Sequence, residues 1–460
     1  MRKLILVFLL IFLATPMIAQ KTDVLNLKEY LVQLKKHHPI IKQANLVIDE
    51  SEAKLLKARG AFDPKFELDY DTKDFKEKDY FDKFSSTFKI PTWYGVELKG
   101  NFENNSGDFL NPENTVPANG LYNIGVSLPL ARDLLINRRM ATLKQAKIYK
   151  QQAAVDNQLM VNKIMFDASL SYFYWLKSYK EKEVYQTFLE NSKLRLNAIK
   201  RSYELGEKPA IDTIEAKIAL NDRILNLEKA KLNFQKATFE LSNYLWINEV
   251  PVEIREEVVP DINATDDVDS VLKLNDINIE NRIETHPKLQ SLAYKLNNLS
   301  IEKKLKRNNL LPKVDFEYNF INQTPSALNS FSNNNYKSSI SAGIPIFLRK
   351  ERADLKLANY KLQAIDFETK ATRFNLQNKI NATRQEIDSY GTQSDIVREL
   401  VADYTTMLKG EERKFEIGGS SLFLINSRES KLIESKLKEI VTENLFLNSK
   451  AKLFNVLGFD

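Results

Sequence analysis

Few residues in this sequence have the types and spacing that catalysis or metal binding requires. The chain has three histidines and no cysteine, so disulfides and thiolate metal sites are excluded. His38 and His286 stand directly before Pro39 and Pro287, and this shared repeat position explains them better than a catalytic role. No Gly-rich phosphate loop, zinc-ligand spacing or serine nucleophile elbow is present, and the GGSS at Gly418 is typical of a turn. The sequence therefore predicts no enzyme, cofactor or metal site.

The regularly spaced carboxylates lie in segments that alternate between polar and apolar residues. FELDY carries Glu67 and Asp69, and VDFEYNF carries Asp315 and Glu317. Such alternation predicts half-buried strands, which in most soluble proteins cover a core with one face. The chain offers no second sheet to cover these strands, and a carboxylate row opposite an aromatic row suits a barrel with lipid outside and water inside. We interpret the four carboxylates as lumen residues and expect a small preference for cations.

The N-terminus has the three parts of a cleaved secretory signal. Two cations are followed by an apolar run from Leu4 to Leu13 and by small residues that end at Ala19. The apolar run is too short for a spanning helix, which needs roughly 20 residues. We therefore expect residues 1–19 to be a signal peptide. The net charge is +6 without a concentrated basic patch, so nucleic acid is not an expected partner.

The chain is an internal tandem repeat. Four landmarks recur in the same order, namely Pro39 with Pro287, Pro64 with Pro312, Pro129 with Pro345, and YELG at Tyr203–Gly206 with FEIG at Phe415–Gly418. The first two pairs are 248 positions apart and the third pair is 216 apart, so the first half carries 32 extra residues between its strands. We expect this insertion, around residues 80–119, to form an extra hairpin and a long loop.

Each half of the chain then predicts a helix, a strand region, a long helix, a Gly turn and a shorter helix. The first repeat is expected at 20–248, with an opening helix at Lys28–Arg59, barrel strands within 64–130, a long helix at 131–205 and a helix at 209–248. A linker at 249–276 is expected as a surface connection or small subdomain. The second repeat is expected at 277–460, with barrel strands within 312–346, a long helix at 347–417 and a helix at 420–457.

Apolar residues at heptad spacing indicate how the shorter helices pack. One row of the first such helix is Ile211, Ile218, Leu225, Leu232, Phe239 and Trp246, and a second row is Leu220, Leu227, Phe234 and Leu241. The two rows lie on nearly opposite sides of the helix, at about 100° per residue. Two opposed rows predict a neighbour on each side, as in a single-layer helical wall, although an ordinary helical bundle is an equal alternative. The matching helix at 420–457 has one broad apolar face.

The signal peptide, the tandem repeat, the paired strands and the ELG and EIG turns together resemble the TolC-like outer-membrane efflux protein family. The resemblance covers essentially the whole mature chain. It implies a mainly α fold in which about four β-strands per chain complete a 12-stranded transmembrane barrel in a homotrimer, with an α-helical barrel as a periplasmic tunnel. It also implies an exit duct in the outer membrane of a Gram-negative bacterium, fed by an inner-membrane transporter through a periplasmic adaptor.

The resemblance places a periplasmic gate and adaptor contact at the helix tips. Carried over by position, the tip residues are Tyr203, Gly206 and Asp212 in the first repeat and Phe415, Gly418, Ser420, Leu424, Ser427 and Arg428 in the second. The family often has acids where Leu424 and Ser427 stand, so we expect a partly apolar gate of Phe415 and Leu424. Asp212 and Arg428 are candidate lock partners. An equal alternative for Asp212 is a favourable carboxylate near a helix N-terminus.

A second hypothesis from another class is a non-conducting periplasmic coiled-coil scaffold or adhesin. It accounts for the signal peptide and the long helices. It does not account for alternating strands with a polar row. The sequence does not identify the exported substrate, the adaptor or the pump.

Overall fold

The computed structural model describes residues 23–255, 257–275, 279–325 and 330–459, so the expected signal peptide lies outside the described residues. The chain divides into two compact units. The first contains the chain up to Ala44, Gln158–Glu284 and Asn375 onward, and the second contains Asn45–Asn157 and Thr285–Phe374. Both sequence repeats contribute to both units, so the boundaries of the repeats are not the boundaries of the units.

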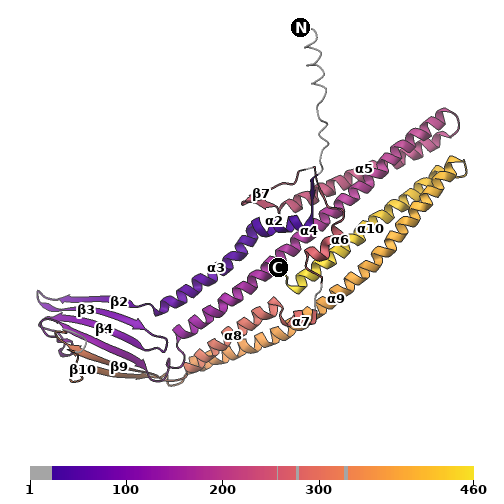
Figure 1. The fold of residues 1–460 in the computed structure, drawn as a ribbon. Helices are drawn as coiled ribbons and strands as arrows, with labels where there is room; N and C mark the ends of the chain where they lie inside the picture. Colours follow the sequence, from indigo (N-terminus) through magenta and orange to yellow (C-terminus); the bar gives the residue numbers. More distant parts are fainter. Residues whose placement is uncertain (1–22, 256, 276–278, 326–329, 460) are drawn as a thin grey trace, which may run out of the picture. The chain divides into compact units, whose positions relative to one another are not determined.

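The second unit contains one antiparallel sheet with the order β10-β9-β5-β4-β3-β2, whose strands lie side by side in Figure 1. The strands are β2 (Lys65–Asp74), β3 (Asp79–Pro91), β4 (Glu97–Ser106), β5 (Leu121–Pro129), β9 (Lys313–Asn322) and β10 (Tyr336–Gly343). The extra hairpin expected around residues 80–119 is β3–β4, and it lies inside the sheet between β2 and β5. Each chain therefore supplies a six-stranded sheet rather than four strands.

The strand register gives this sheet one polar and one apolar face. A row of directly opposed residues runs from Lys65 through Lys89, Lys99, Gly125 and Asn319 to Lys337. The neighbouring apolar row runs from Phe66 through Phe88, Gly100, Ile124 and Phe320 to Tyr336. Because the side-chain period along a strand is two, each face keeps its character over most of each strand. The exceptions lie near the β2–β3 turn, where Asp82 is on the apolar face and Phe81 is on the polar face.

The opening helical segment is two helices rather than one. α2 (Leu27–His37) and α3 (Pro39–Arg59) are separated by His38, whose backbone is extended with φ −69° and ψ 131°. Pro39 lacks an amide proton and disfavours a helical conformation at the residue before it. Asn26 caps α2 by accepting a hydrogen bond from the Glu29 amide at 2.8 Å.

Two very long helices, α4 (Arg138–Glu204) and α9 (Arg349–Glu416), leave the sheet. α4 begins at Arg138 and not at residue 131, because Asn137 caps it by accepting from the Met140 amide at 2.8 Å. Before the cap the chain is still tied to the sheet, since the Leu130 amide donates to the Val314 carbonyl at 2.7 Å. Each long helix is followed by a shorter helix, α5 (Ala210–Ser242) after α4 and α10 (Leu422–Leu457) after α9.

The remaining elements are short, apart from one helix of the second unit. They are β1 (Asp23–Leu25), β6 (Trp246–Ile247), β7 (Val250–Pro251), β8 (Val258–Pro260), α6 (Ala264–Val271), α7 (Ile279–Glu284) and α8 (Pro287–Asn308), with single 3-10 turns at Gly60–Phe62 and Pro112–Asn114. Since α5 ends at Ser242, Trp246 is not part of its heptad row. Among the described helices, none is long and apolar enough to cross a membrane.

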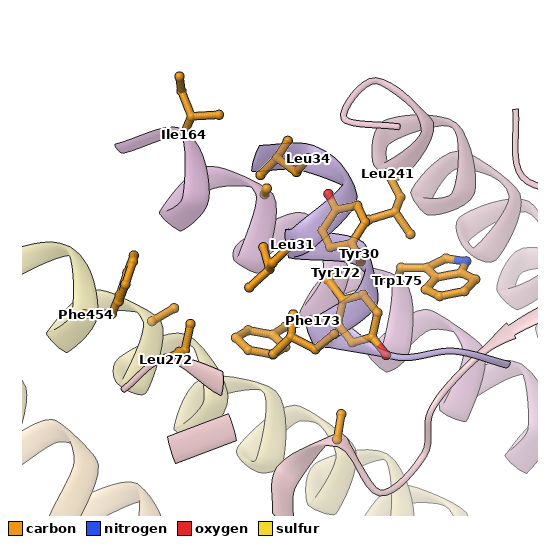
Figure 2. Close-up of a cluster of buried hydrophobic side chains, with 14 of the residues drawn as sticks. Tyr30, Leu31, Leu34, Ile164, Tyr172, Phe173, Trp175, Leu241, Leu272 and Phe454 are labelled. Atoms are coloured by element: carbon orange, nitrogen blue, oxygen red, sulfur yellow. The ribbon is translucent and has the colours of Figure 1, made fainter. Parts of the chain in front are cut away.

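The main core of the first unit gathers side chains from α2, α4, α5 and α10 (Figure 2). Tyr30, Tyr172 and Trp175 are fully buried there, and the Tyr172 hydroxyl donates to the Leu25 carbonyl at 2.8 Å. Val268 and Leu272, from the segment between the repeats, are also buried in this core. That segment is therefore anchored to the core through α6 and the residue after it, whereas Val250 and Ile262 of the same segment are exposed.

Candidate functional site

The two predicted tips are built by the same backbone turn. At the end of α4, the Gly206 amide donates to the Tyr203 carbonyl and the Glu207 amide to the Ser202 carbonyl, both at 2.9 Å. At the end of α9, the Gly418 amide donates to Phe415 at 3.0 Å and the Gly419 amide to Lys414 at 2.8 Å. Both glycines are left-handed, with φ +78° and +79°, which favours glycine at this position. The repeated YELG and FEIG motifs are therefore two copies of one helix stop.

The two tips also pack on each other. Phe415 of α9 is half-buried against a small cluster that includes Ile199 of α4 and Leu422 of α10, and the Lys208 ammonium lies 4.6 Å from its ring centroid. Leu424 remains 37% exposed. Phe415 thus holds the two turns of one chain together, and the structure gives it a packing role within the chain rather than a free position beside Leu424.

The polar tip residues find partners within the second repeat. Ser420 donates to Glu411 of α9 at 2.5 Å, and the Arg428 Nε lies 3.7 Å from the same carboxyl group. Ser427 is half-buried in the first turns of α10. Asp212 lies in the first turn of α5 and makes no ion pair with any described residue. Asp212 and Arg428 therefore do not pair within one chain.

A buried cluster of charged residues joins the helices near the tips. Glu429 of α10 is fully buried, and it accepts hydrogen bonds from Arg195 of α4 at 2.9 Å and Arg223 of α5 at 3.4 Å. Arg195 also lies 3.6 Å from Glu412 of α9. Asn426 extends the network by donating to Glu215 of α5 at 3.0 Å. Four helices are thus joined by one charged network, whose members must stay paired because water does not reach Glu429.

The predicted lumen carboxylates share the polar face of the sheet with lysines. Glu67 pairs with Lys89 at 2.5 Å, and Glu317 pairs with Lys99 at 3.0 Å. Asp315 lies 3.0 Å from Lys313, whereas Asp69 has no ion-pair partner among the described residues. The polar face is therefore a mixed-charge surface, and the cation preference stays a prediction of a small effect. A hollow of about 330 Å³ is lined by residues of this face.

α5 carries a long apolar stripe that no described residue covers. The five helical residues of the first heptad row, Ile211, Ile218, Leu225, Leu232 and Phe239, are 52–65% exposed. In the opposed row, Leu227 and Leu241 are 3% and 0% exposed. One row therefore packs within the chain, and the other is available to another molecule.

Comparison with known proteins finds a family match in the second repeat. Residues 278–458 match the model of a family described as outer membrane efflux protein. No curated protein matches the chain in sequence.

Solved structures extend the similarity to nearly the whole chain. The chain is similar to the CmeC outer membrane channel of Campylobacter jejuni, with a TM-score of 0.64, 13% identity and coverage of 94% of this chain and 86% of that one. It is similar to a membrane protein of Pseudomonas aeruginosa, with a TM-score of 0.67, 14% identity and coverage of 96% and 92%. The outer membrane protein VceC of Vibrio cholerae gives a TM-score of 0.65, 11% identity and coverage of 94% and 96%.

These matches confirm the resemblance to TolC-like outer membrane efflux proteins and the mainly α fold with strands from both repeats. The family match covers the second repeat, and the similar structures are an outer membrane channel, a membrane protein and an outer membrane protein. At identities of 11–14% the neighbours show the fold alone. The roles of individual tip and sheet residues therefore have to be argued from this chain.

The sequence interpretation missed the Glu429 cluster, although the second repeat carries a signal for it. Glu429 falls between Ile425 and Leu432 on the apolar face of α10, and at about 100° per residue all three point the same way. An acid in an apolar row predicts a buried charge that needs a cationic partner. The partner helices could not have been identified from the heptads alone.

Proposed function

We propose that copies of this chain assemble into a homotrimeric exit channel of the outer membrane, with a long periplasmic part. In this assembly the polar face of the sheet lines a water-filled lumen and the apolar face meets lipid. The observation that carries the proposal is that two surfaces have no packing or hydrogen-bonding partner among the described residues. The sheet has two open edges, β2 and β10, and α5 has an uncovered apolar stripe. A neighbouring copy provides partners for both.

The channel would serve as the last part of a tripartite efflux or type I secretion system. The exposed apolar side chains at the tips support contact with a periplasmic adaptor, and through it with an inner-membrane transporter. Leu205, Ile417 and Phe423 are 66%, 80% and 67% exposed there, more than a tip surrounded only by water favours. A non-conducting scaffold or adhesin would have no use for a sheet with one polar and one apolar face.

We assign the gate to the same tips. Because Arg428 is held beside Glu411 of its own chain, a lock between Asp212 and Arg428 has to join different copies. Leu424, which is 37% exposed one turn before Arg428 on α10, would narrow the entrance together with these charges. Phe415 would support the gate by holding the two turns of one chain together.

The test is whether purified protein forms a pore. Detergent-extracted chain should migrate as a trimer before heating and should open discrete conductance steps in a planar bilayer. A chain that remains a monomer in plain buffer and opens no conductance would contradict the proposal. A stable trimer without conductance would favour the scaffold.

A further inference from the structure

The edge strands of the sheet have no partner in the described part of the chain. All ten residues of β2 and all eight of β10 are exposed, whereas the four strands between them are paired on both sides. Within hydrocarbon each unpaired backbone group costs several kcal/mol, so an open edge does not persist in a membrane. The following inference rests on the proposed function, because it places this sheet in a membrane.

The directions of the two edges allow them to pair with each other in neighbouring copies. All five pairings in the sheet are antiparallel, and with six strands the first and the last run in opposite directions. Copies related by rotation about a common axis therefore bring β2 of one against β10 of the next in antiparallel orientation. We propose that three copies close an eighteen-stranded barrel through a β2–β10 seam in which Lys65 lies opposite Gly343 of the neighbouring copy.

The seam register follows from the side chains. Residues of the polar face must lie opposite residues of the polar face, so the register between β2 and β10 can change only in steps of two residues. With Lys65 opposite Gly343, all eight residues of β10 are paired, Lys337 faces Asp71, and Ile340 faces Leu68. A shift of two in one direction sets Lys337 against Lys73, where like charges repel.

The shift in the other direction is excluded by the barrel geometry. Within one chain, the row of opposed residues that starts at Lys65 ends at Lys337. In the proposed seam Lys337 lies opposite Asp71 of the neighbouring copy, six residues beyond Lys65. The strand register is therefore shifted by six residues per copy, which equals the six strands that each copy supplies. With strand spacing and rise of about 4.8 and 3.3 Å, the strands tilt by about 35°. The other shift has a stagger of four and a tilt of about 25°, below the usual range of roughly 35–45° for membrane barrels.

The same arithmetic gives the width of the exit. Eighteen strands at this tilt close a ring of about 34 Å in backbone diameter, against about 22 Å for twelve strands. After inward side chains are allowed for, the opening accommodates two α-helices of about 10–12 Å side by side. The barrel therefore sets no size limit for small molecules, and it is wide enough for a polypeptide hairpin.

Cysteine pairs test the seam directly, because the chain has no cysteine of its own. The double variant Leu68→Cys with Ile340→Cys should form an intermolecular disulfide on mild oxidation and yield a covalent species of three chains on denaturing gels. Leu68→Cys with Ser341→Cys is the matched control, since its second residue points to the opposite face. Phe66→Cys with Ile340→Cys and Tyr70→Cys with Ile340→Cys report the two shifted registers. Asp71→Cys with Lys337→Cys probes the same register from the polar face if the first pair fails to fold.

The outcomes separate the seam from the function. Strong cross-linking in the Leu68–Ile340 or Asp71–Lys337 pair, with weak cross-linking in the control and shifted pairs, supports the proposal. Conducting channels without cross-linking in either pair overturn the seam and leave the proposed function standing. A covalent ladder that ends at two or four chains overturns the count of eighteen strands. Absence of both conductance and cross-linking contradicts the proposed function itself.

Discussion

The last helices of the two repeats, α5 and α10, occupy matching places in the sequence but pack differently. α10 buries a broad apolar face that includes Leu432, Ile440 and Leu447, whereas α5 buries one row and exposes the opposed one. Of the two repeated helices, α10 therefore belongs to the core, and α5 lies at the surface with one apolar row exposed. The difference shows that α10 is packed within the chain, whereas the exposed row of α5 needs a neighbouring molecule to cover it.

The strand regions differ in the same manner. The first repeat contributes four strands and the second contributes two, and the extra hairpin β3–β4 lies within the sheet rather than beside it. Strand pairing extends the sheet without changing its two-faced character. A repeat can therefore widen the sheet by one hairpin between two existing strands.

The largest effect is expected from the buried charge that distinguishes α10 from α5. Glu429→Gln leaves Arg223 without its anion and Arg195 with only Glu412 at 3.6 Å, and breaking such a buried pair costs about 3–5 kcal/mol. At the matching position of α5, Lys217 is exposed, and Lys217→Gln should change stability by about 0.5 kcal/mol or less. Thermal unfolding in detergent compares the two variants. Equal midpoints would remove the distinction between the helices.

The next effect concerns the exposed stripe of α5. Leu225→Lys places a charge in the middle of the stripe, so the isolated chain should fold normally while the oligomer is lost. Gln235→Lys is the matched control, because it adds the same charge to an exposed position about a quarter turn away. Unheated gel migration and circular dichroism measure assembly and folding. Normal oligomers in Leu225→Lys would contradict the assignment of the stripe to a neighbouring copy.

A smaller, functional effect is expected where the two repeats meet at the tips. Asp212→Lys and Arg428→Glu should each raise single-channel conductance, because each replaces attraction between copies by repulsion at the entrance. Asp222→Lys, an exposed change farther along α5, should leave conductance unaltered. If both tip variants conduct like the unmodified protein, the lock between Asp212 and Arg428 does not exist.

The smallest effect concerns His38, the histidine that precedes the first repeat proline. Burial lowers the pKa of His38, whose Nδ1 accepts from the Ile40 amide at 3.3 Å. The folded state therefore favours the neutral ring, and its contribution to stability is present above the unfolded pKa of about 6.5 and lost as the pH falls through the lower folded value. His38→Gln should flatten the pH dependence between neutral and acidic conditions. Unfolding midpoints at a series of pH values measure this, and an unchanged profile would assign the acid sensitivity to other groups.

Much of the helical organisation could be predicted because it depends on local patterns. The two opposed rows of α5 predicted two neighbours, and in the described residues one row is buried within the chain while the other is exposed. The YELG and FEIG motifs predicted two equivalent turns, because glycine in the left-handed region ends a helix irrespective of tertiary context. The alternating strands likewise gave the two faces of the sheet.

The remainder depended on pairings that a sequence pattern does not contain. Whether the hairpin around residues 80–119 joins the sheet is decided by which edges it meets, not by its alternation. The start of α4 depended on the Asn137 cap together with hydrogen bonds to the distant second repeat. The partners of Glu429 come from two helices far away in the sequence, and their rotation about the axis decides which side chains meet.

The most direct test of the account is planar-bilayer conductance of the purified mature chain, recorded beside the Leu225→Lys variant. The account predicts discrete, uniform steps from the unmodified protein and none from the variant, because only associated copies enclose a lumen. Steps of equal size from both proteins, or no steps from the unmodified protein, would contradict the claim that self-association makes the channel.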